Sequence, residues 1–178
     1  MQYRRLCQKG GCYFFTLVTY QRARLFDVPQ NVARLEDAFR HVRAKRPFAI
    51  DAIVVLPDHL HCVMHLPEGD DDFATRWRLI KHYFSRGVVR TDHWFWRSRH
   101  SRGEVGVWQR RYWEHLIRDD DDWRRHVDYV HYNPVKHGLA LRPVDWPYSS
   151  FRGAVARGWY EPGWGAGEPQ VIRGAEWE

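Results

Sequence analysis

Residues 48–66 read FAIDAIVVLPDHLHCVMHL, and this stretch predicts two neighbouring strands of one sheet. Both 48–56 and 59–66 have the length of short strands, and the first is rich in β-branched residues, which is typical of buried strands. Only the turn-forming dipeptide Pro57-Asp58 separates them. Because a connection this short leaves no room for a crossover, we expect an antiparallel hairpin.

The second strand of the hairpin carries two histidines two positions apart. Residues with this spacing point to the same face of a sheet, so His59 and His61 project together while Leu60 enters the opposite layer. Two adjacent imidazoles form a ready pair of metal ligands. A chance occurrence is the alternative in a chain with 11 histidines. His65 shares the face but lies near the strand end, and it is a spare candidate.

The rest of the chain alternates predicted strands and helices around this hairpin. We expect strands at 12–20 and 108–117 and helices at 29–45, 73–89 and 123–133, with a loop at 93–106. The acidic runs Asp70–Asp72 and Asp119–Asp122 supply helix N-caps, and Pro134 is expected to end the last helix. The order β-α-β-β-α-β-α predicts an α+β fold, a ferredoxin-like antiparallel sheet with helices packed on one face.

The domain organisation follows from length and composition. A chain of 178 residues fits a single domain, and we place it at residues 1–146. Residues 147–178 are punctuated by Gly, Pro and Trp, and we expect a C-terminal tail that packs on the domain or extends from it.

Charge is distributed unevenly along the chain. The net charge is +6, and residues 73–111 contain ten Lys and Arg against two acids, with Trp and Phe interleaved. This pattern is expected of a nucleic-acid-binding surface, although a solvated basic helix face gives the same pattern.

The cysteines and the apolar stretches indicate an intracellular setting. Three cysteines without a CxxC pair are typical of a reducing compartment. No apolar run approaches the roughly 20 residues of a membrane span, and no apolar segment of the signal-peptide type follows the N-terminus. We expect a cytoplasmic, nucleoid-associated protein that does not bind membranes.

The last predicted helix carries a possible nucleophile. Tyr129 and Asn133 are four residues apart and share a helical face with His126. Tyrosine is a poor nucleophile at its free pKa of about 10, so it needs a base or a metal ion that stabilises the developing charge. The alternatives are an ordinary core-edge tyrosine and, for Asn133, a helix C-cap before Pro134.

Taken together, these motifs resemble those of a known family. The stretch PDHLHCVMHLP, followed by HVDYVHYNPVKHG, resembles the REP-associated tyrosine transposases, a branch of the HUH single-strand nucleases with IS200-like relatives. The resemblance also covers GGCYFFT, RPFAIDAIVVLPDHLH, PEGDDDFATRWRLIK, VWQRRYWEH and DWPYSSF, nearly the whole chain. It implies the HUH nuclease fold, with His59, His61 and Asn133 as metal ligands and Tyr129 as the catalytic residue.

Two positions depart from the pattern of the family. Met64 stands where relatives often carry Trp, and Asp58 stands where many carry Asn or Glu. Neither is expected to touch the chemistry. Asp58 adjoins His59, so it should face away from the metal unless the strand is bulged there.

The resemblance also implies a reaction and a partner. Tyr129 would cleave single-stranded DNA next to REP-type hairpins through a 5′-phosphotyrosine intermediate, with Mg²⁺ or Mn²⁺ as cofactor; paired histidines alone would also suit zinc. Relatives recognise a short single-stranded tetranucleotide beside a hairpin and look monomeric, whereas shorter cousins are homodimers. A catalytically silent hairpin-DNA-binding protein is the alternative, while an RNA phosphoesterase would need a second histidine motif. Our candidates for DNA contact are Arg4, Arg5, Arg76, Arg78, Lys81, Arg110 and Arg111.

Overall fold

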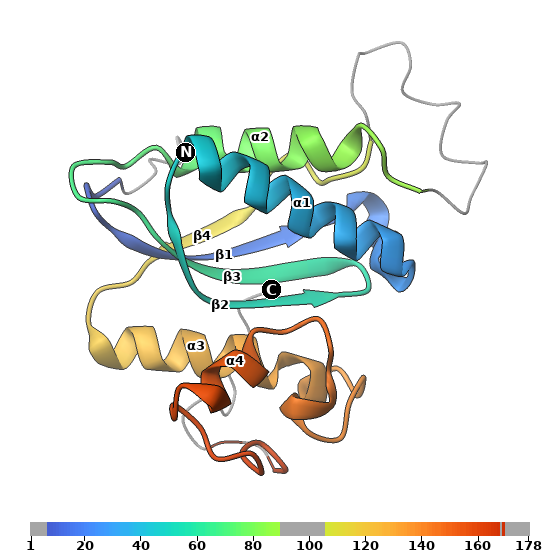
Figure 1. The fold of residues 1–178 in the computed structure, drawn as a ribbon, viewed down its shortest axis with the longest axis vertical. Coiled ribbons are helices and arrows are strands. Elements are labelled where there is room, and N and C mark those ends of the chain that lie inside the picture. The colour runs from blue at the N-terminus through green and yellow to red at the C-terminus, as the bar shows by residue number, and fades with distance from the viewer. Residues whose placement is uncertain (1–6, 90–105, 168, 170–178) are drawn as a thin grey trace.

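Four strands form one antiparallel sheet in the computed structural model, which describes residues 7–89, 106–167 and 169 (Figure 1). The strands lie in the order β2-β3-β1-β4, and every neighbouring pair is antiparallel. Their bounds are β1 Cys12–Val18, β2 Ala49–Leu56, β3 His59–His65 and β4 Trp113–Leu116. The predicted α+β class, the ferredoxin-like sheet and the hairpin across Pro57-Asp58 are confirmed.

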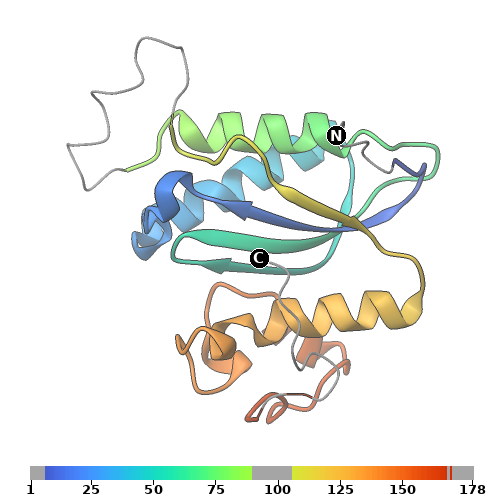
Figure 2. The same ribbon diagram turned by 180° about the vertical axis from the view of Figure 1, so that it is seen from behind.

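Helices cover both faces of this sheet (Figures 1 and 2). Helices α1 (Pro29–Lys45) and α2 (Phe73–Ser85) lie on one face, and α3 (Asp120–Lys136) and α4 (Phe151–Ala156) lie on the other. The expectation of helices on one face therefore holds for α1 and α2 only. The physical reason is that six of the seven residues of β3 are buried, and a strand buried on both faces needs a layer on each side.

Two hydrophobic cores result from the alternation of side chains along the strands. Leu60, Cys62 and Met64 of β3 enter the core beneath α1 and α2. Val63 enters the second core, together with Tyr129 of α3. His59 and His61 alternate with the first set, so they face α3.

Helix α3 is longer than the sequence predicted. It begins at Asp120, where the Asp119 side chain accepts a hydrogen bond from the Asp122 amide, and it continues through Pro134 to Lys136. A proline near the end of a helix removes only one backbone hydrogen bond. The Asn133 carbonyl still accepts from the His137 amide, and this bond keeps the last turn closed.

The fourth strand is shorter than predicted. Pairing with β1 covers only Trp113–Leu116, and Trp108 forms an isolated bridge with Thr19. In the register of β1 and β4, Thr19 would face residue 110, but it bridges with Trp108, so residues 109–112 form an irregular stretch between that bridge and the regular pairing. The first strand ends at Val18 instead of residue 20, because the chain then turns into a 3₁₀ segment, Tyr20–Arg22.

The predicted helix boundaries on the other face are close to the observed ones. Helix α1 has its predicted bounds, whereas α2 ends at Ser85 instead of residue 89. Asp72 caps α2 as expected, because its side chain accepts a hydrogen bond from the Thr75 amide. The loop predicted at 93–106 lies almost entirely outside the described residues.

The segment after residue 147 is tied to the outer edge of β2. The Val55 amide donates to the Tyr148 carbonyl, and the Ser150 amide donates to the Ile53 carbonyl. Phe151 of α4 is fully buried. These bonds cover an otherwise open sheet edge. The division of the chain at residue 146 stays a prediction.

Across the described residues, no helix is both long enough and apolar enough to cross a membrane.

Candidate active site

His59 and His61 lie side by side on the face of β3 that α3 covers. Their ring centroids are 5.0 Å apart, and both side chains are buried. Each Nδ1 has a partner: the Asp58 carboxylate lies 2.6 Å from that of His59, and the Thr16 hydroxyl lies 2.9 Å from that of His61. Partners on Nδ1 orient imidazole rings and direct Nε2 toward a metal.

Asp58 supports the site from behind His59: its carboxylate lies at Nδ1 and not at Nε2, the nitrogen that a metal would take. It lies in the turn between β2 and β3, where strand alternation no longer applies, and its carboxylate bonds His59 and Arg22. Burial would raise the pKa of Asp58, but the hydrogen bond with His59 and the Arg22 guanidinium hold it below its usual value. An ionised Asp58 favours the His59 tautomer that carries its proton on Nδ1 and a lone pair on Nε2.

His61 is suited to be a neutral ligand. Burial lowers its pKa well below the ordinary value, and the neighbouring His59 and His137 lower it further. Its Nε2 is buried and has no hydrogen-bond partner among the described residues. A buried nitrogen without a partner is costly unless something else binds it.

Tyr129 comes from α3 and packs directly against this pair. Its ring centroid is 5.3 Å from that of His61, and the side chain is 1% exposed. The Lys136 ammonium lies 3.2 Å from the phenol oxygen and 4.9 Å from the ring centroid. All of these groups belong to one chain, so the site does not need a partner subunit to bring them together.

Asn133 lies one helical turn after Tyr129. It is fully buried, and neither its side-chain oxygen nor its side-chain nitrogen has a hydrogen-bond partner among the described residues. The helix continues to Lys136, so a C-cap role is excluded. An amide buried in this way, one turn from a tyrosine that touches His61, offers an oxygen ligand for a divalent cation.

The other histidines singled out in the sequence lie in different clusters. His126 stacks on His115, with ring centroids 4.7 Å apart, and both lie beside the Asp122 carboxylate. That carboxylate is already held by the Arg118 guanidinium. His65 is exposed at the far end of β3, near Cys12 and Asp51. Each cluster has ligand atoms close enough for a metal, but neither includes His59 or His61.

One of the arginines predicted to bind DNA is part of the core instead. Arg76 is 1% exposed, and its guanidinium donates to both Asp70 oxygens, at 3.1 and 2.6 Å, and to the Pro47 carbonyl at 2.7 Å. Arg76 lies three residues after Phe73 and four before Ile80, so it shares the buried face of α2 with them. Arg76 cannot reach a phosphate from this position, and the prediction for it is wrong.

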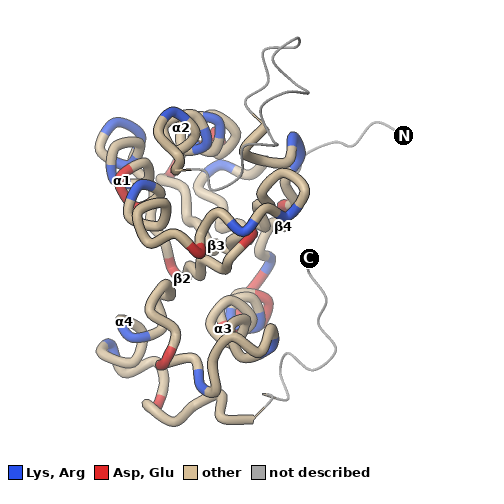
Figure 3. Tube along the Cα trace, turned by 90° about the vertical axis from the view of Figure 1, so that its right-hand side faces the viewer, with Lys and Arg blue, Asp and Glu red and all other residues tan. Residues whose placement is uncertain are grey.

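The remaining described candidates are exposed or half-buried. Figure 3 colours the Lys and Arg positions along the chain in blue. Arg78, Arg110 and Arg111 are exposed. Lys81 is half-buried, donates to the Gln109 carbonyl at 3.1 Å and lies over the Tyr112 ring, so it joins α2 to the segment before β4. Arg4 and Arg5 lie outside the described residues. A role of these side chains in DNA binding stays a prediction.

Three residues of this site were not identified from the sequence as parts of it. Lys136 follows Tyr129 by seven residues, a spacing that returns to the same helical face, but Pro134 made a helix through it implausible. Thr16 reaches His61 because β1 pairs with β3 in a register that places the two residues opposite each other. No local pattern reveals such a register. The contact of Asp58 with His59 Nδ1 was likewise not predicted from the sequence.

Comparisons with known proteins give a consistent result. An Escherichia coli K12 protein named REP-associated tyrosine transposase is 44% identical over 164 residues, 92% of this chain and 90% of that protein. A Haemophilus influenzae protein with the same family name is 42% identical over 172 residues, 97% of each chain. A solved structure of a REP-associated tyrosine transposase bound to a REP hairpin matches 96% of both chains with a TM-score of 0.77 and 42% identity. No family model matches the chain.

Proposed function

Because the chain belongs to the REP-associated tyrosine transposases, which are DNA strand-transferring enzymes, we propose that Tyr129 cleaves and rejoins single-stranded DNA beside a REP-type hairpin. The observation that carries this proposal is the contact between the Tyr129 ring and His61, with the Lys136 ammonium at the phenol oxygen. This arrangement places a potential nucleophile beside potential metal ligands within a single chain.

The residues present fit a divalent cation. His59, His61 and Asn133 would hold Mg²⁺ or Mn²⁺, since the amide oxygen and the phosphate oxygens of DNA are ligands that these ions prefer. When bound, the ion would polarise the scissile phosphate and neutralise its charge. The buried Nε2 of His61 and the buried amide of Asn133, both without hydrogen-bond partners among the described residues, support this ligand set.

Tyr129 would react as a covalent nucleophile. Its phenol oxygen loses its proton and attacks the phosphorus, and the bond from phosphorus to the 3′ oxygen breaks. The products are a 5′-phosphotyrosine and a DNA strand whose 3′ oxygen has taken up a proton. Attack by a 3′-hydroxyl on the phosphotyrosine reverses the step and joins strands without an external energy source.

Lys136 would assist this step. An ammonium 3.2 Å from the phenol oxygen stabilises the negative charge that develops there as the proton leaves. The same side chain lies against the ring, so it also holds the ring in place beside His61.

The site is closed in this structure. Tyr129 is 1% exposed and Asn133 is fully buried, so side chains or backbone around α3 must move before a phosphate reaches the phenol oxygen. Hairpin DNA is the partner that supplies this phosphate. The exposed Arg78, Arg110 and Arg111 are the described candidates for its backbone.

The test is a cleavage assay on a labelled hairpin with a single-stranded flank, with Mg²⁺ or Mn²⁺. Tyr129→Phe is expected to abolish cleavage and to retain hairpin binding. Tyr132→Phe is the matched control on the same helix and is expected to cleave. Full cleavage by Tyr129→Phe would refute the assignment. Binding without cleavage by the unaltered chain would favour the alternative, a silent hairpin-binding protein.

A further inference from the structure

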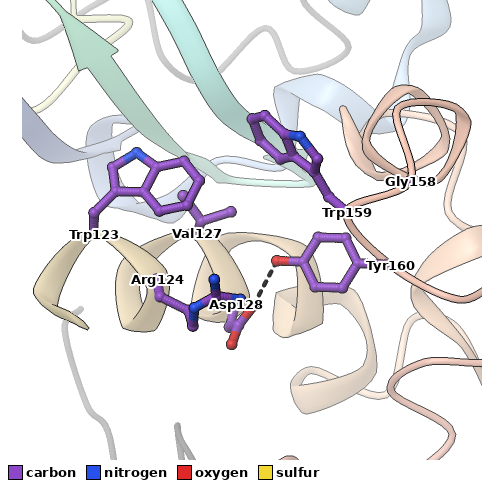
Figure 4. Close-up of a pocket in the computed structure, with 7 residues that line it drawn as sticks. All are labelled: Trp123, Arg124, Val127, Asp128, Gly158, Trp159 and Tyr160. Carbon is purple, nitrogen blue, oxygen red and sulfur yellow. Dashed lines mark hydrogen bonds between the residues drawn. The ribbon is translucent and has the colours of Figure 1, made fainter. Parts of the chain in front are cut away.

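A hollow of about 280 Å³ lies between α3 and the segment that follows α4. Trp123, Arg124, Val127 and Asp128 of α3 form one side, and residues 158–160 form the other (Figure 4). Tyr129, by contrast, turns toward His61 on the sheet. The hollow is therefore separate from the candidate active site, although the same helix contributes to both.

Two indole rings form the walls of this hollow. Trp123 and Trp159 have ring centroids 5.5 Å apart and an interplanar angle of 73°. The Trp123 ring is fixed because its Nε1 donates to the Asp51 carboxylate of β2 at 2.8 Å. Trp159 is 42% exposed, which is unusual for so large an apolar ring. A fixed ring and an exposed ring beside an open space suit a flat aromatic ligand.

A hydrogen-bonded polar pair joins the two sides of the hollow. The Tyr160 hydroxyl donates to Asp128 Oδ1 at 2.5 Å, and Figure 4 shows the two side chains meeting across the hollow. A carboxylate accepts several hydrogen bonds, so Asp128 retains acceptor capacity for a ligand. Donors such as ring N–H groups and exocyclic amino groups of nucleobases match this capacity.

Two arginines lie beside the hollow. Arg124 lines it, and the Arg157 guanidinium lies 4.4 Å from the centroid of the Trp159 ring. Two guanidinium groups disfavour a cationic ligand, which an aromatic cage with a carboxylate would otherwise accept. They favour a ligand that carries a phosphate.

We infer that this hollow binds one unpaired nucleotide of the DNA strand, with its base stacked on Trp159, its polar edge on Asp128 and its phosphate near Arg124. The inference rests on the proposed function for the DNA itself, but not on the chemistry of Tyr129. Stacking on an aromatic ring tolerates every base, so the hollow contributes affinity and positioning more than sequence recognition.

The test is binding of fluorescently labelled hairpins with a single-stranded flank to the full chain, with a single abasic site moved along the flank. The unaltered chain is expected to lose affinity at one position. Trp159→Ala is expected to weaken binding to the intact flank by about 5- to 150-fold and to remove this dependence on position. Trp159→Phe keeps a stacking surface and should keep most of the affinity.

Further variants and competitors separate the possible outcomes. Arg124 is exposed, so Arg124→Ala should not affect folding. The change is expected to weaken the same complex and to reduce the slope of log affinity against log salt by about one. Free deoxynucleoside monophosphates should compete only weakly, and strong competition would identify a mononucleotide site instead. Equal binding of all variants, with hairpin cleavage intact, would refute the inference alone. A chain that binds no hairpin would refute both this inference and the proposed function.

Discussion

The adjacent arginines of α2 offer a direct comparison between a structural and a surface role. Arg76→Ala removes a guanidinium that is 1% exposed and bonded to Asp70, to the Asp72 carbonyl and to the Pro47 carbonyl. Arg78→Ala removes an exposed one on the same helix. We expect the first change to lower stability and the second to lower DNA affinity only.

The magnitude follows from what each change leaves behind. Removing one partner of a buried ion pair costs about 3–5 kcal/mol. The Asp70 side chain is 33% exposed and can be hydrated, so we expect the lower end, about 3 kcal/mol. For a chain of this length that lowers Tm by about 6 to 12 °C. An exposed substitution such as Arg78→Ala should change stability by less than about 0.5 kcal/mol.

Urea unfolding followed by tryptophan fluorescence measures the first effect, and a salt titration of hairpin affinity measures the second. Arg78→Ala should reduce the slope of log affinity against log salt by about one, whereas Arg76→Ala, measured where it is folded, should leave the slope unchanged. The reasoning is refuted if Arg76→Ala is as stable as the unaltered chain, or if it flattens the slope more than Arg78→Ala does.

Three further predictions concern the metal ligands and the buried histidines. Thr16→Val removes the hydroxyl on His61 Nδ1 and should weaken Mn²⁺ affinity about 10- to 100-fold by calorimetry, whereas an unchanged affinity would exclude Thr16 as a support of the ligand. Chelation by EDTA should abolish cleavage, and added Mg²⁺ or Mn²⁺ should restore it; cleavage that persists in EDTA would contradict the ligand set. Burial, and then the charge of Arg157, lower the pKa of His131 to about 3, so the unfolded chain binds a proton below its ordinary pKa of 6.5 that the folded chain does not. The free energy of unfolding should therefore fall as the pH drops below 6.5, by about 1.4 kcal/mol per pH unit from this group, and by less in His131→Gln. Urea unfolding at pH 7 and pH 5 measures this loss for the unaltered chain and for the variant. An equal loss in both would show that His131 does not contribute.

The elements that local pattern determines were predicted well. The hairpin on either side of Pro57-Asp58 and the direction of His59 and His61 follow from chain length and strand alternation alone. Helix α1 has its predicted bounds because Pro29 and Pro47 lie on either side of it. The prediction that Tyr129 faces the histidine pair combined this alternation with the family resemblance, and the structure places the two rings in contact.

The features that depend on tertiary packing were not predictable. Arg76 and Arg78 are both basic residues on one helix, and only the position of Asp70 and Pro47 buries the first. Helix α3 continues through Pro134 because packing on the sheet outweighs the loss of one hydrogen bond. The offset between the Thr19–Trp108 bridge and the regular pairing of β1 with β4 shortens β4, and such a register between distant segments leaves no local pattern.

The placement of α3 on the second face of the sheet has the largest functional consequence. An arrangement with all helices on one face would have left His59 and His61 uncovered. In the structure α3 covers that face, with Tyr129 against His61 and Lys136 at the phenol oxygen. Six consecutive residues of β3 are buried, and a strand buried on both faces needs a covering layer on each side. The sequence of β3 therefore already favoured two layers of helices.

If Tyr129 is the nucleophile, it becomes covalently bound to DNA during cleavage, and peptide mapping of the trapped product detects that bond. The protein is incubated with a flanked hairpin and Mn²⁺, digested with a protease and a nuclease, and analysed by mass spectrometry. We predict a 5′-phosphonucleotide on the peptide that contains Tyr129, and none on the peptide that contains Tyr112. An adduct on another residue, or cleaved DNA with free 5′-phosphate and no adduct, would contradict the account.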